Sequence, residues 1–340
     1  MLKKWLKNLT LIAALAASTL SSLALAEAVP DQVRFAYAGG PRVWILGKID
    51  TSFDKAFGTK VKWIPFNSGA DVLTLFAAKE IDIARFGSSP AAAGIARKLA
   101  VEVIGVPEVI ATSERLIARK GIASLKDLEG KTVAFPANST AQYAFEVAIK
   151  LAKVDRSKIK GLALKPSEML AAWKRNDIDA AYVWGPFTQQ LEGDGGKEIF
   201  ATRDLQKDGV LVFNNFVVRK EFADKNPELV AKFLRVVQEK VDQYKKDPEG
   251  SAQLIAKHLD IPVETARSTL AGLQYPSLSE QLTPAYIGNE TTKAGSRITR
   301  AYKDSANFLA EIGEVRKADI PESYASAINT TYLQRAAAGK

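Results

Sequence analysis

The run Phe-Gly-Ser-Ser-Pro at residues 86–90 groups residue types that can hold a small anion. Ser88 and Ser89 carry hydroxyl groups, and three alanines that favour a helix follow the run. The first backbone N–H groups of a helix are unpaired and form the positive end of its dipole, so an anion is stabilised there. The run therefore predicts an anion-binding site. The alternative left open by these residues alone is that the two serines only cap the helix.

The flanking segments place this run at the end of a strand. Residues 81–86 have the composition of a short buried strand. Gly87 can adopt backbone angles that other residues avoid, Ser89 is a natural N-cap, and Pro90 suits the first helical position. A helix is therefore expected to begin directly after the strand.

A second strand, turn and helix with hydroxyl groups at its tip follows later. The expected strand covers residues 131–135, and the expected helix covers residues 141–153. Ser139 and Thr140 lie in the turn between them. The sequence thus predicts two tips that could donate hydrogen bonds to one anion.

Other chemistries fit these residues less well. A nucleophilic serine needs a base, and His258, the only histidine, lies at the end of a distant expected helix. Asp82 and Asp179 resemble a carboxylate pair, but each follows a helix end and is expected to cap a turn. A lone histidine without an acidic cluster argues against a metal site, and no Gly-rich phosphate loop occurs. We therefore expect no enzyme activity, no metal and no cofactor.

Strand and helix patterns alternate over the first part of the chain. This alternation predicts an α/β fold with a mainly parallel sheet covered by helices on both faces. The expected strands are residues 32–37, 60–66, 81–86 and 101–106, and the expected helices are 43–57 and 70–79. Ligands of such sheets bind beyond the carboxyl ends of the strands, where the turns at 39–40, 67–69 and 87–89 would lie.

A faint internal repeat predicts two lobes of similar plan. Ile-Asp-Ile-Ala at 81–84 and Ile-Asp-Ala-Ala at 178–181 stand in the same position between a helix and a strand, 97 residues apart. After a strand-like run at 210–219, the expected elements are helices at 227–244, 248–259, 263–273, 288–312 and 323–335. We expect the first lobe at residues 27–115, the second at 116–212, and a return to the first lobe over 213–340. The crossings near 113–120 and 211–218 would be the hinge.

The first 26 residues have the pattern of a secretory signal peptide. Three lysines precede a mostly small and apolar run at 9–25, and Ala-Leu-Ala at 24–26 fits the cleavage rule. A retained membrane anchor is the alternative, but serine and threonine residues interrupt the run. Removing the three lysines lowers the formal charge from +9 to +6. This excess is spread along the chain, which argues against nucleic-acid binding. The chain has no cysteine, so it forms no disulfide in an oxidising compartment.

Seven motifs resemble those of the taurine-binding periplasmic proteins. These proteins belong to the nitrate/sulfonate/taurine group of ABC-transporter substrate-binding proteins. The motifs are Phe-Asn-Ser-Gly-Ala at 66–70, Phe-Gly-Ser-Ser-Pro at 86–90, Ser-Thr-Ala-Gln-Tyr at 139–143, Ala-Ala-Trp at 171–173, Asp-Ile-Asp at 177–179, Ala-Tyr-Val-Trp-Gly-Pro at 181–186 and Val-Val-Arg-Lys at 217–220. The similarity runs in order through nearly all of the chain after residue 26.

The resemblance implies a two-lobed periplasmic binding protein fold of type II, with mixed sheets flanked by helices and two crossover strands as the hinge. It implies a monomer in the periplasm that closes on a small organosulfonate and delivers it to an ABC permease of the inner membrane with its cytoplasmic ATPase. Ser88, Ser89, Ser139, Thr140 and Trp184 would line the cleft. The complete set of candidate ligand contacts is Gly40, Arg42, Ser68, Ser88, Ser89, Ser139, Thr140, Trp184, Asn214 and Phe216.

Two departures from the family leave the ligand open. Arg42 stands where the taurine-binding proteins have a glutamate, and Asn214 stands where they have an aspartate. Either acid could pair with the ammonium group of taurine. The ligand is then a sulfonate without an amine, or one with a second anionic group that meets Arg42. Alternatively, Arg42 points to solvent and Trp184 holds the ammonium through its ring face.

Other functions with the same fold also remain open. They are binding of an alkanesulfonate, an aromatic sulfonate or nitrate, a sensory role, or a role in synthesis of the thiamine pyrimidine. Aromatic residues expected near the cleft favour an organic ligand over a bare inorganic ion, and they are Trp44, Phe66, Trp184 and Phe216.

Overall fold

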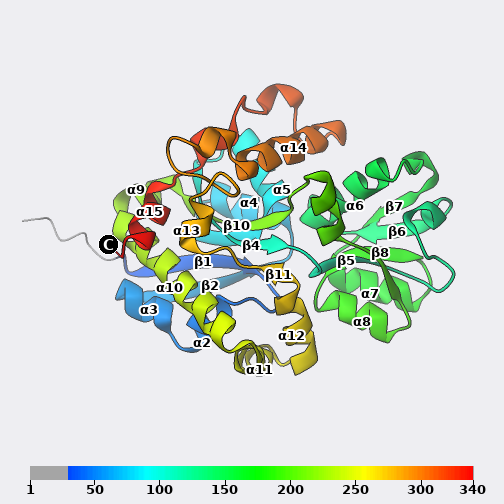
Figure 1. Cartoon of the computed structure of the whole chain (residues 1–340), viewed down its shortest axis with the longest axis horizontal. Coiled ribbons are helices and arrows are strands. Elements are labelled where there is room, and N and C mark those ends of the chain that lie inside the picture. The colour runs from blue at the N-terminus through cyan, green and yellow to red at the C-terminus, as the bar shows by residue number, and fades with distance from the viewer. Residues whose placement is uncertain (1–29, 340) are drawn as a thin grey trace, which may run out of the picture. The chain divides into compact units, whose positions relative to one another are not determined.

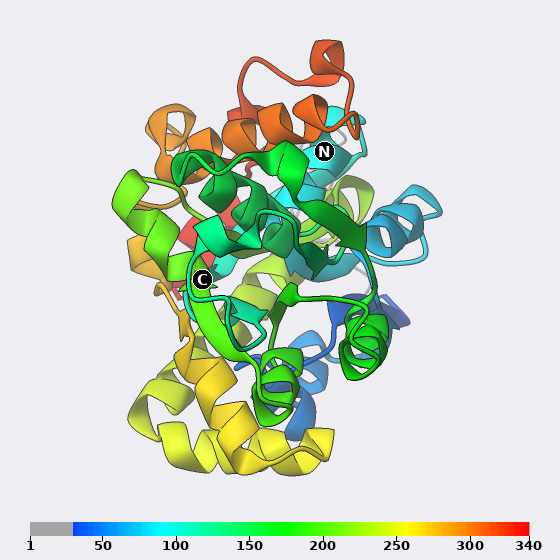
Figure 2. The same ribbon diagram turned by 90° about the vertical axis from the view of Figure 1, so that its right-hand side faces the viewer.

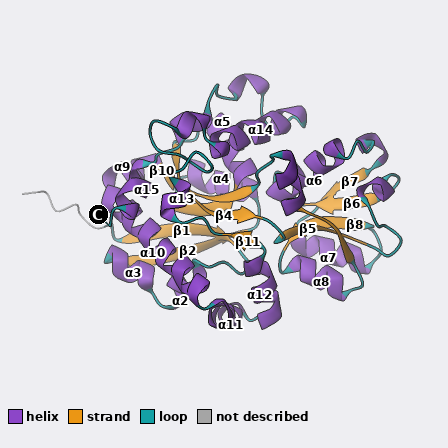
Figure 3. Cartoon of the chain, in the orientation of Figure 1, coloured by secondary structure: helices purple, strands orange, loops and turns teal. Residues whose placement is uncertain are grey.

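Two β-sheets, each covered by helices, make up the part of the chain that the structure describes (Figures 1 and 3). The structure is a computed structural model that describes residues 30–339. The expected signal peptide, residues 1–26, lies outside the described residues. Among residues 30–339, no helix combines the length and the apolar character needed to cross a membrane.

The first sheet has, within the described residues, six strands in the order β11-β4-β10-β3-β1-β2. β1, β2 and β3 run parallel, whereas β10 is antiparallel to β3 and β4. The bounds are β1 Gln32–Ala38, β2 Lys60–Phe66, β3 Ile83–Gly87, β4 Val101–Ile110, β10 Phe213–Arg219 and β11 Leu273–Gln274. The alternation of the sequence therefore predicted the parallel half of this sheet correctly.

The second sheet, counted over the same residues, has five strands in the order β7-β6-β8-β5-β9. β6 is parallel to β7 and β8, and β5 is antiparallel to β8 and β9. The bounds are β5 Glu114–Ala118, β6 Thr132–Phe135, β7 Lys160–Ala163, β8 Ala180–Trp184 and β9 Lys197–Ala201.

The two sheets repeat one plan, which explains the sequence repeat. The order β2-β1-β3-β10-β4 matches β7-β6-β8-β5-β9, with β3 and β8 as the central strands. The Asp82 carboxylate, just before β3, accepts a hydrogen bond from the backbone N–H of Arg34 at 2.9 Å. The Asp179 carboxylate, just before β8, accepts one from the N–H of Thr132 at 2.8 Å. Both aspartates therefore join neighbouring strands, which corrects the expectation that they cap turns.

Helices cover both faces of each sheet (Figure 1). On the first sheet, α4 Gly69–Ala77, α5 Ser88–Ala96 and α14 Arg297–Glu311 lie on one side, and α2 Ile45–Ile49, α3 Ser52–Phe57 and α10 Pro227–Lys246 lie on the other. On the second sheet, α6 Thr140–Leu151 lies opposite α7 Pro166–Lys174 and α8 Phe187–Gly193. The remaining helices are α9 Lys220–Lys225, α11 Pro248–Leu259, α12 Val263–Ala271, α13 Leu278–Gln281 and α15 Thr331–Ala337.

The chain after β10 packs against the first sheet and its helices. α14 contacts α5, and α10 contacts α3 and α15. In Figure 2, where the second sheet and its helices face the viewer, α14 and the segment α11–α12 lie above and below them. This packing supports the lobe boundaries expected from the sequence, which we keep as a proposal.

The two sheets are connected by short crossovers at residues 111–113 and 202–212. The N–H of Arg203 donates to the carbonyl of Ala111 at 3.1 Å, so the two crossovers are in contact. The N–H groups of Ala111 and Ser113 both donate to the carbonyl of Gly272. The expected crossings at 113–120 and 211–218 begin here, but most of their residues belong to β5 and β10.

Three expected helices are shorter than the sequence pattern suggested. The segment 43–57 forms α2 and α3, because Thr51 adopts a left-handed conformation with φ of 60° between them. The segment 288–312 is helical mainly over α14, and 323–335 contains a short 3-10 turn before α15. Apolar spacing alone could not show these interruptions.

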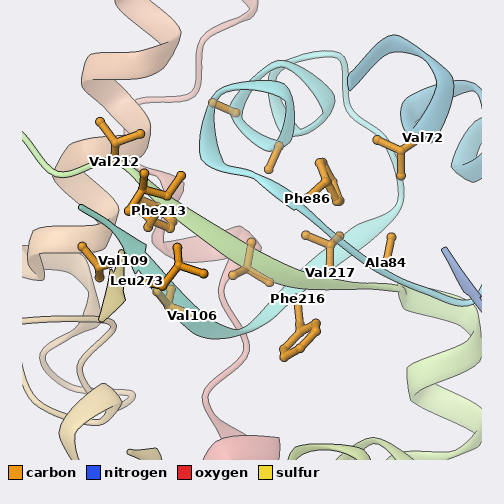
Figure 4. Close-up of a cluster of buried hydrophobic side chains, with 14 of the residues drawn as sticks. Val72, Ala84, Phe86, Val106, Val109, Val212, Phe213, Phe216, Val217 and Leu273 are labelled. Atoms are coloured by element: carbon orange, nitrogen blue, oxygen red, sulfur yellow. The ribbon is translucent and has the colours of Figure 1, made fainter. Parts of the chain in front are cut away.

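An aromatic core fixes the strands that carry the site. Phe216 of β10 packs edge to face on Phe233 of α10, with ring centroids 4.7 Å apart, and Phe35 of β1 lies 5.6 Å from the same ring. In Figure 4, Phe216 and Phe86 point to opposite sides of this sheet. Because aromatic contacts of this kind add to the burial of large apolar area, they hold β1 and β10 in a fixed relation to α10.

Candidate functional site

A small cavity lies where the carboxyl ends of the strands of the two sheets meet. Its volume is about 60 Å³, several times the 10–15 Å³ that one water needs. Ala38, Phe66 and Gly87 reach it from the ends of β1, β2 and β3, and Trp184 reaches it from the end of β8. Its position agrees with the rule for ligand sites in α/β sheets.

The N-terminus of α5 borders the cavity. Gly87 is its N-cap residue, and Gly87 and Pro90 line the cavity. Ser88 and Ser89 lie between them in the chain but are not among the residues that line the cavity, contrary to the expectation from the sequence. Both are fully buried, and their hydroxyl groups have no hydrogen-bond partner within residues 30–339. Ser89 is not the cap and Pro90 is not the first helical residue, so the capping alternative for the two serines is wrong. Buried hydroxyls without a partner are costly, and no group among the described residues offsets this cost.

Gly87 is needed for space and not for its backbone angles, because its φ of −70° is open to any residue. A Cβ atom on Gly87 would lie 2.7 Å from Cγ2 of Thr140, the first residue of α6. This glycine therefore lets the α5 and α6 N-termini approach each other across the cavity.

We expect Gly87→Ala to weaken ligand binding without unfolding the protein. The added methyl group pushes the two helix N-termini apart, and overpacking of this kind costs about 1–3 kcal/mol, or roughly 5- to 150-fold in affinity. Gly39→Ala is the matched control, because Gly39 also lines the cavity and its Cβ would meet no atom within 4 Å among the described residues. Isothermal titration calorimetry of both variants checks this; equal losses would contradict it.

The N-terminus of α6 closes the cavity from the second sheet. Ser139 is its N-cap: the hydroxyl accepts from the N–H of Gln142 at 3.1 Å and donates to the carbonyl of Pro136 at 2.6 Å. The hydroxyl of Thr140 donates to Oε1 of Glu114 at 2.6 Å. Both residues line the cavity, but their hydroxyl groups already have partners. The backbone N–H groups of this first turn are therefore the better donors for an anion.

Glu114, which the sequence analysis did not select, lines the cavity at the start of β5. It is 5% exposed, and its Oε2 has no hydrogen-bond partner in the described part of the chain. Burial raises the pKa of Glu114 to about 7, against the opposing effects of the Thr140 hydroxyl and the guanidinium groups of Arg42 and Arg85. Its charge can therefore change near neutral pH.

A buried ionic cluster forms the wall on the side of the first sheet. The carboxylate of Glu108 on β4 accepts from Nε and Nη2 of Arg85 on β3, and from Nδ2 of Asn214 on β10 at 3.1 Å. Nε of Arg42 lies 3.8 Å from the same Glu108 oxygen, Oε2. Burial, together with repulsion by Arg85, lowers the pKa of Arg42 to about 10. Arg42 is only 4% exposed, so the alternative that it points to solvent is wrong.

The remaining candidates divide between the cavity and its surroundings. Ser68, the N-cap of α4, lines the cavity, as does the half-buried Trp184. Gly40 lies beside it with φ of 105°, and a Cβ there would lie 3.1 Å from the carbonyl oxygen of Gly185. Phe216 lies in the core instead: it is 1% exposed, packs on Phe233 and is not among the residues that line the cavity. We therefore withdraw Phe216 as a ligand contact.

Three charged residues of the site were missed: Arg85, Glu108 and Glu114. Each is a charged residue near the carboxyl end or the start of an otherwise apolar strand. That pattern was the available signal, because charges are rarely buried unless they are paired or functional. Asn67 and Asn138 also line the cavity from turns next to predicted residues.

The fold and the cavity define the class of protein, a two-lobed binding protein. The alkanesulfonate-binding protein SsuA from Xanthomonas axonopodis pv. citri, solved with bound MOPS, has the same fold with a TM-score of 0.73. The match covers 89% of this chain and 100% of that one at 20% identity. It confirms the periplasmic binding protein fold predicted from the sequence.

The chain belongs to the NMT1/THI5-like family, whose profile matches residues 53–251. It is 30% identical to the taurine-binding periplasmic protein of Escherichia coli (strain K12) over 332 residues, 96% of this chain and 98% of the relative. It is 25% identical to a putative aliphatic sulfonates-binding protein of Bacillus subtilis (strain 168), over 66% of this chain and 67% of the relative. The resemblance stated from the motifs is confirmed.

Proposed function

We propose that this protein is the substrate-binding component of an ABC importer and binds taurine or a related small organosulfonate. The ligand lies in the cavity between the two sheets, and the two lobes close on it. The protein works as a monomer in the periplasm, where it arrives through its signal peptide, and presents the ligand to a permease of the inner membrane. It has no enzymatic activity and does not bind nucleic acid.

The observation that carries this proposal is the pair of helix N-termini at the cavity. α5 belongs to the first lobe and α6 to the second, and Gly87 keeps them close. A sulfonate has three oxygens that need several donors at once, and bonds to an ionised acceptor are about twice as strong as neutral ones. An anion held from both lobes stabilises only the closed arrangement, which is how a ligand shifts a population of states.

The chemistry around the cavity supports binding and not catalysis. The single histidine, His258, lies in the last turn of α11 and is not part of the cavity lining. The sequence has no cysteine. Within residues 30–339, no group of His, Asp and Glu side chains could hold a metal ion. The relatives named above are binding proteins, which favours the same role here.

A titration panel tests the proposal with taurine, isethionate, ethanesulfonate, nitrate and sulfate. We expect at least one small sulfonate to bind, and the double variant Ser88→Ala/Ser89→Ala to lose at least about tenfold in affinity. Ser251→Ala is the matched control, because Ser251 is also buried without a hydroxyl partner among the described residues. It lies in α11, none of whose residues lines the cavity, whereas Gly87 and Pro90 on either side of the two serines do. Binding of nitrate alone would favour a nitrate-binding protein, one of the alternatives that the sequence leaves open, and no binding across the panel would refute the proposal.

Binding of a monoanionic sulfonate such as isethionate should weaken as the pH rises through about 7. Glu114 shares Thr140 with the proposed anion site and faces Arg42 and Arg85, with Tyr182 of β8 nearby. Its pKa is raised to about 7, so below that value it is a neutral acid and above it a carboxylate that repels the anion. Affinity should fall by up to about tenfold per pH unit above the pKa. Glu114→Gln should abolish this slope, and a flat wild-type profile from pH 6 to 8 would contradict the account.

A further inference from the structure

The cavity wall on the side of the first sheet carries more positive charge than its buried partners neutralise. Arg42 and Arg85 both line the cavity and are 4% and 2% exposed. The carboxylate paired with both of them is that of Glu108, which lies outside the lining. Glu114 also lines the cavity and faces both guanidinium groups, but below its pKa of about 7 it is mainly a neutral acid. At pH 6.5 the two guanidinium groups therefore share one carboxylate.

The pairing within this cluster is unequal. Arg85 donates through both Nε and Nη2 to Oε2 of Glu108, and Asn214 donates to the same oxygen. Arg42 remains 3.8 Å from that oxygen and donates instead to the carbonyl of Pro41 through Nη1. Its Nε is fully buried and has no hydrogen-bond partner in the described chain. Arg42 is therefore the less completely paired of the two cations at the cavity.

The same cavity is also suited to a sulfonate. The N-termini of α5 and α6 border it, and each contributes roughly half a positive charge. A ligand of net charge −1 would leave Arg42 with only the carboxylate that it shares with Arg85, and the ammonium of a zwitterion would face two guanidinium groups. A buried cation without a partner is strongly unfavourable.

We propose that the ligand is an organosulfonate with a second anionic group, such as a carboxylate, and that Arg42 and Arg85 form the subsite for that group. This inference rests on the proposed function and specifies its substrate class. Arg42 supplies the less neutralised guanidinium group, and Arg85 supplies positive charge while it stays paired with Glu108. Guanidinium groups suit carboxylates because their N–H donors match the geometry of two oxygens.

Three two-carbon sulfonates test whether the second group of the ligand is anionic. They are sulfoacetate, isethionate and taurine, which end in a carboxylate, a hydroxyl and an ammonium group, respectively. Calorimetric titration of the purified protein at pH 6.5 should give affinities that decrease in the order sulfoacetate, isethionate, taurine. The affinity for sulfoacetate should exceed that for isethionate by at least about tenfold. Arg42→Gln should weaken sulfoacetate binding by about 10- to 150-fold and isethionate binding by less than about fivefold. Arg42→Lys keeps the positive charge but loses the planar N–H donors of the guanidinium group. It should keep the same order of affinities, with sulfoacetate bound less tightly than by the wild type.

Arg115→Gln is the control, because Arg115 is also a largely buried arginine but pairs with Glu192 and Glu198 outside the cavity lining. It should leave the order and the affinities unchanged. Tighter binding of taurine than of sulfoacetate, or an equal loss of all three ligands in Arg42→Gln, would overturn the inference and leave sulfonate binding intact. Binding of none of the three would refute both the inference and the proposed function.

Discussion

Asp82→Asn should lower the free energy of unfolding by about 3 kcal/mol or more, the cost of removing one partner of a buried ion pair. The Asp82 side chain is 3% exposed and accepts from Nη2 of Arg34 at 2.6 Å and Nη2 of Arg219 at 2.8 Å. The two arginines belong to β1 and β10, on either side of β3. The substitution places an amide with two donors between two guanidinium groups and so weakens the centre of the first sheet. Chemical denaturation measures the loss.

The second lobe offers a matched control for this prediction. Asp179 holds the start of β8 to Thr132 in the same way, but in the described residues it has no arginine partner within salt-bridge distance. Asp179→Asn keeps an oxygen acceptor, so we expect a loss of about 1 kcal/mol or less. Equal losses in the two variants would contradict the role given to the arginine pair.

The acid stability of the protein should change with Asp82→Asn as well. Burial opposes ionisation of Asp82, but hydrogen bonds from Arg34 and Arg219 outweigh it and hold the pKa of this carboxyl below its usual value. A depressed pKa stabilises the fold above the unfolded value of about 3.9, and this stabilisation is lost as the pH falls through the folded value. The difference between wild type and variant should therefore shrink below about pH 4.

Glu108→Gln should lower the free energy of unfolding by about 3–5 kcal/mol. Glu108 is 1% exposed, and its loss of charge leaves Arg42 and Arg85 without a buried anion between them. An anionic ligand in the cavity should restore part of this stability, because it supplies the missing negative charge. Chemical denaturation with and without sulfoacetate measures both effects.

Glu102→Gln on the same strand is the control for Glu108→Gln. Its partner Lys220 is about half exposed and lies 3.4 Å away, and exposed ion pairs contribute about 0–1 kcal/mol. A similar small loss in Glu108→Gln, or no recovery with the anionic ligand, would show that the cluster is not the charged centre of the site.

The sequence predicted the local elements that begin and end with clear signals. β1, β2 and α11 were expected at, or within one residue of, their observed bounds, because alternating apolar residues and the prolines and glycines around them mark these ends. The two hydroxyl-tipped helix N-termini were also expected, and the structure places both at the cavity. The confirmed resemblance supplied the two-lobed fold.

The ionic cluster could not be predicted from the chain order. Arg85 and Glu108 lie on β3 and β4, and β10, from more than a hundred residues later, lies between these strands in the sheet. Only the insertion of β10 brings Asn214 to Glu108. Likewise, the need for Gly87 depends on Thr140 of the other lobe, which local turn preferences do not reveal.

The most direct test of the account is a crystal structure of the protein with a bound two-carbon sulfonate. We expect the sulfonate oxygens to accept hydrogen bonds from the first turns of both α5 and α6, with the other end of the ligand toward Arg42. A ligand held by one lobe only, or a sulfonate directed at Arg42 with the helix N-termini left unpaired, would contradict the central claim that the two N-termini hold the anion together.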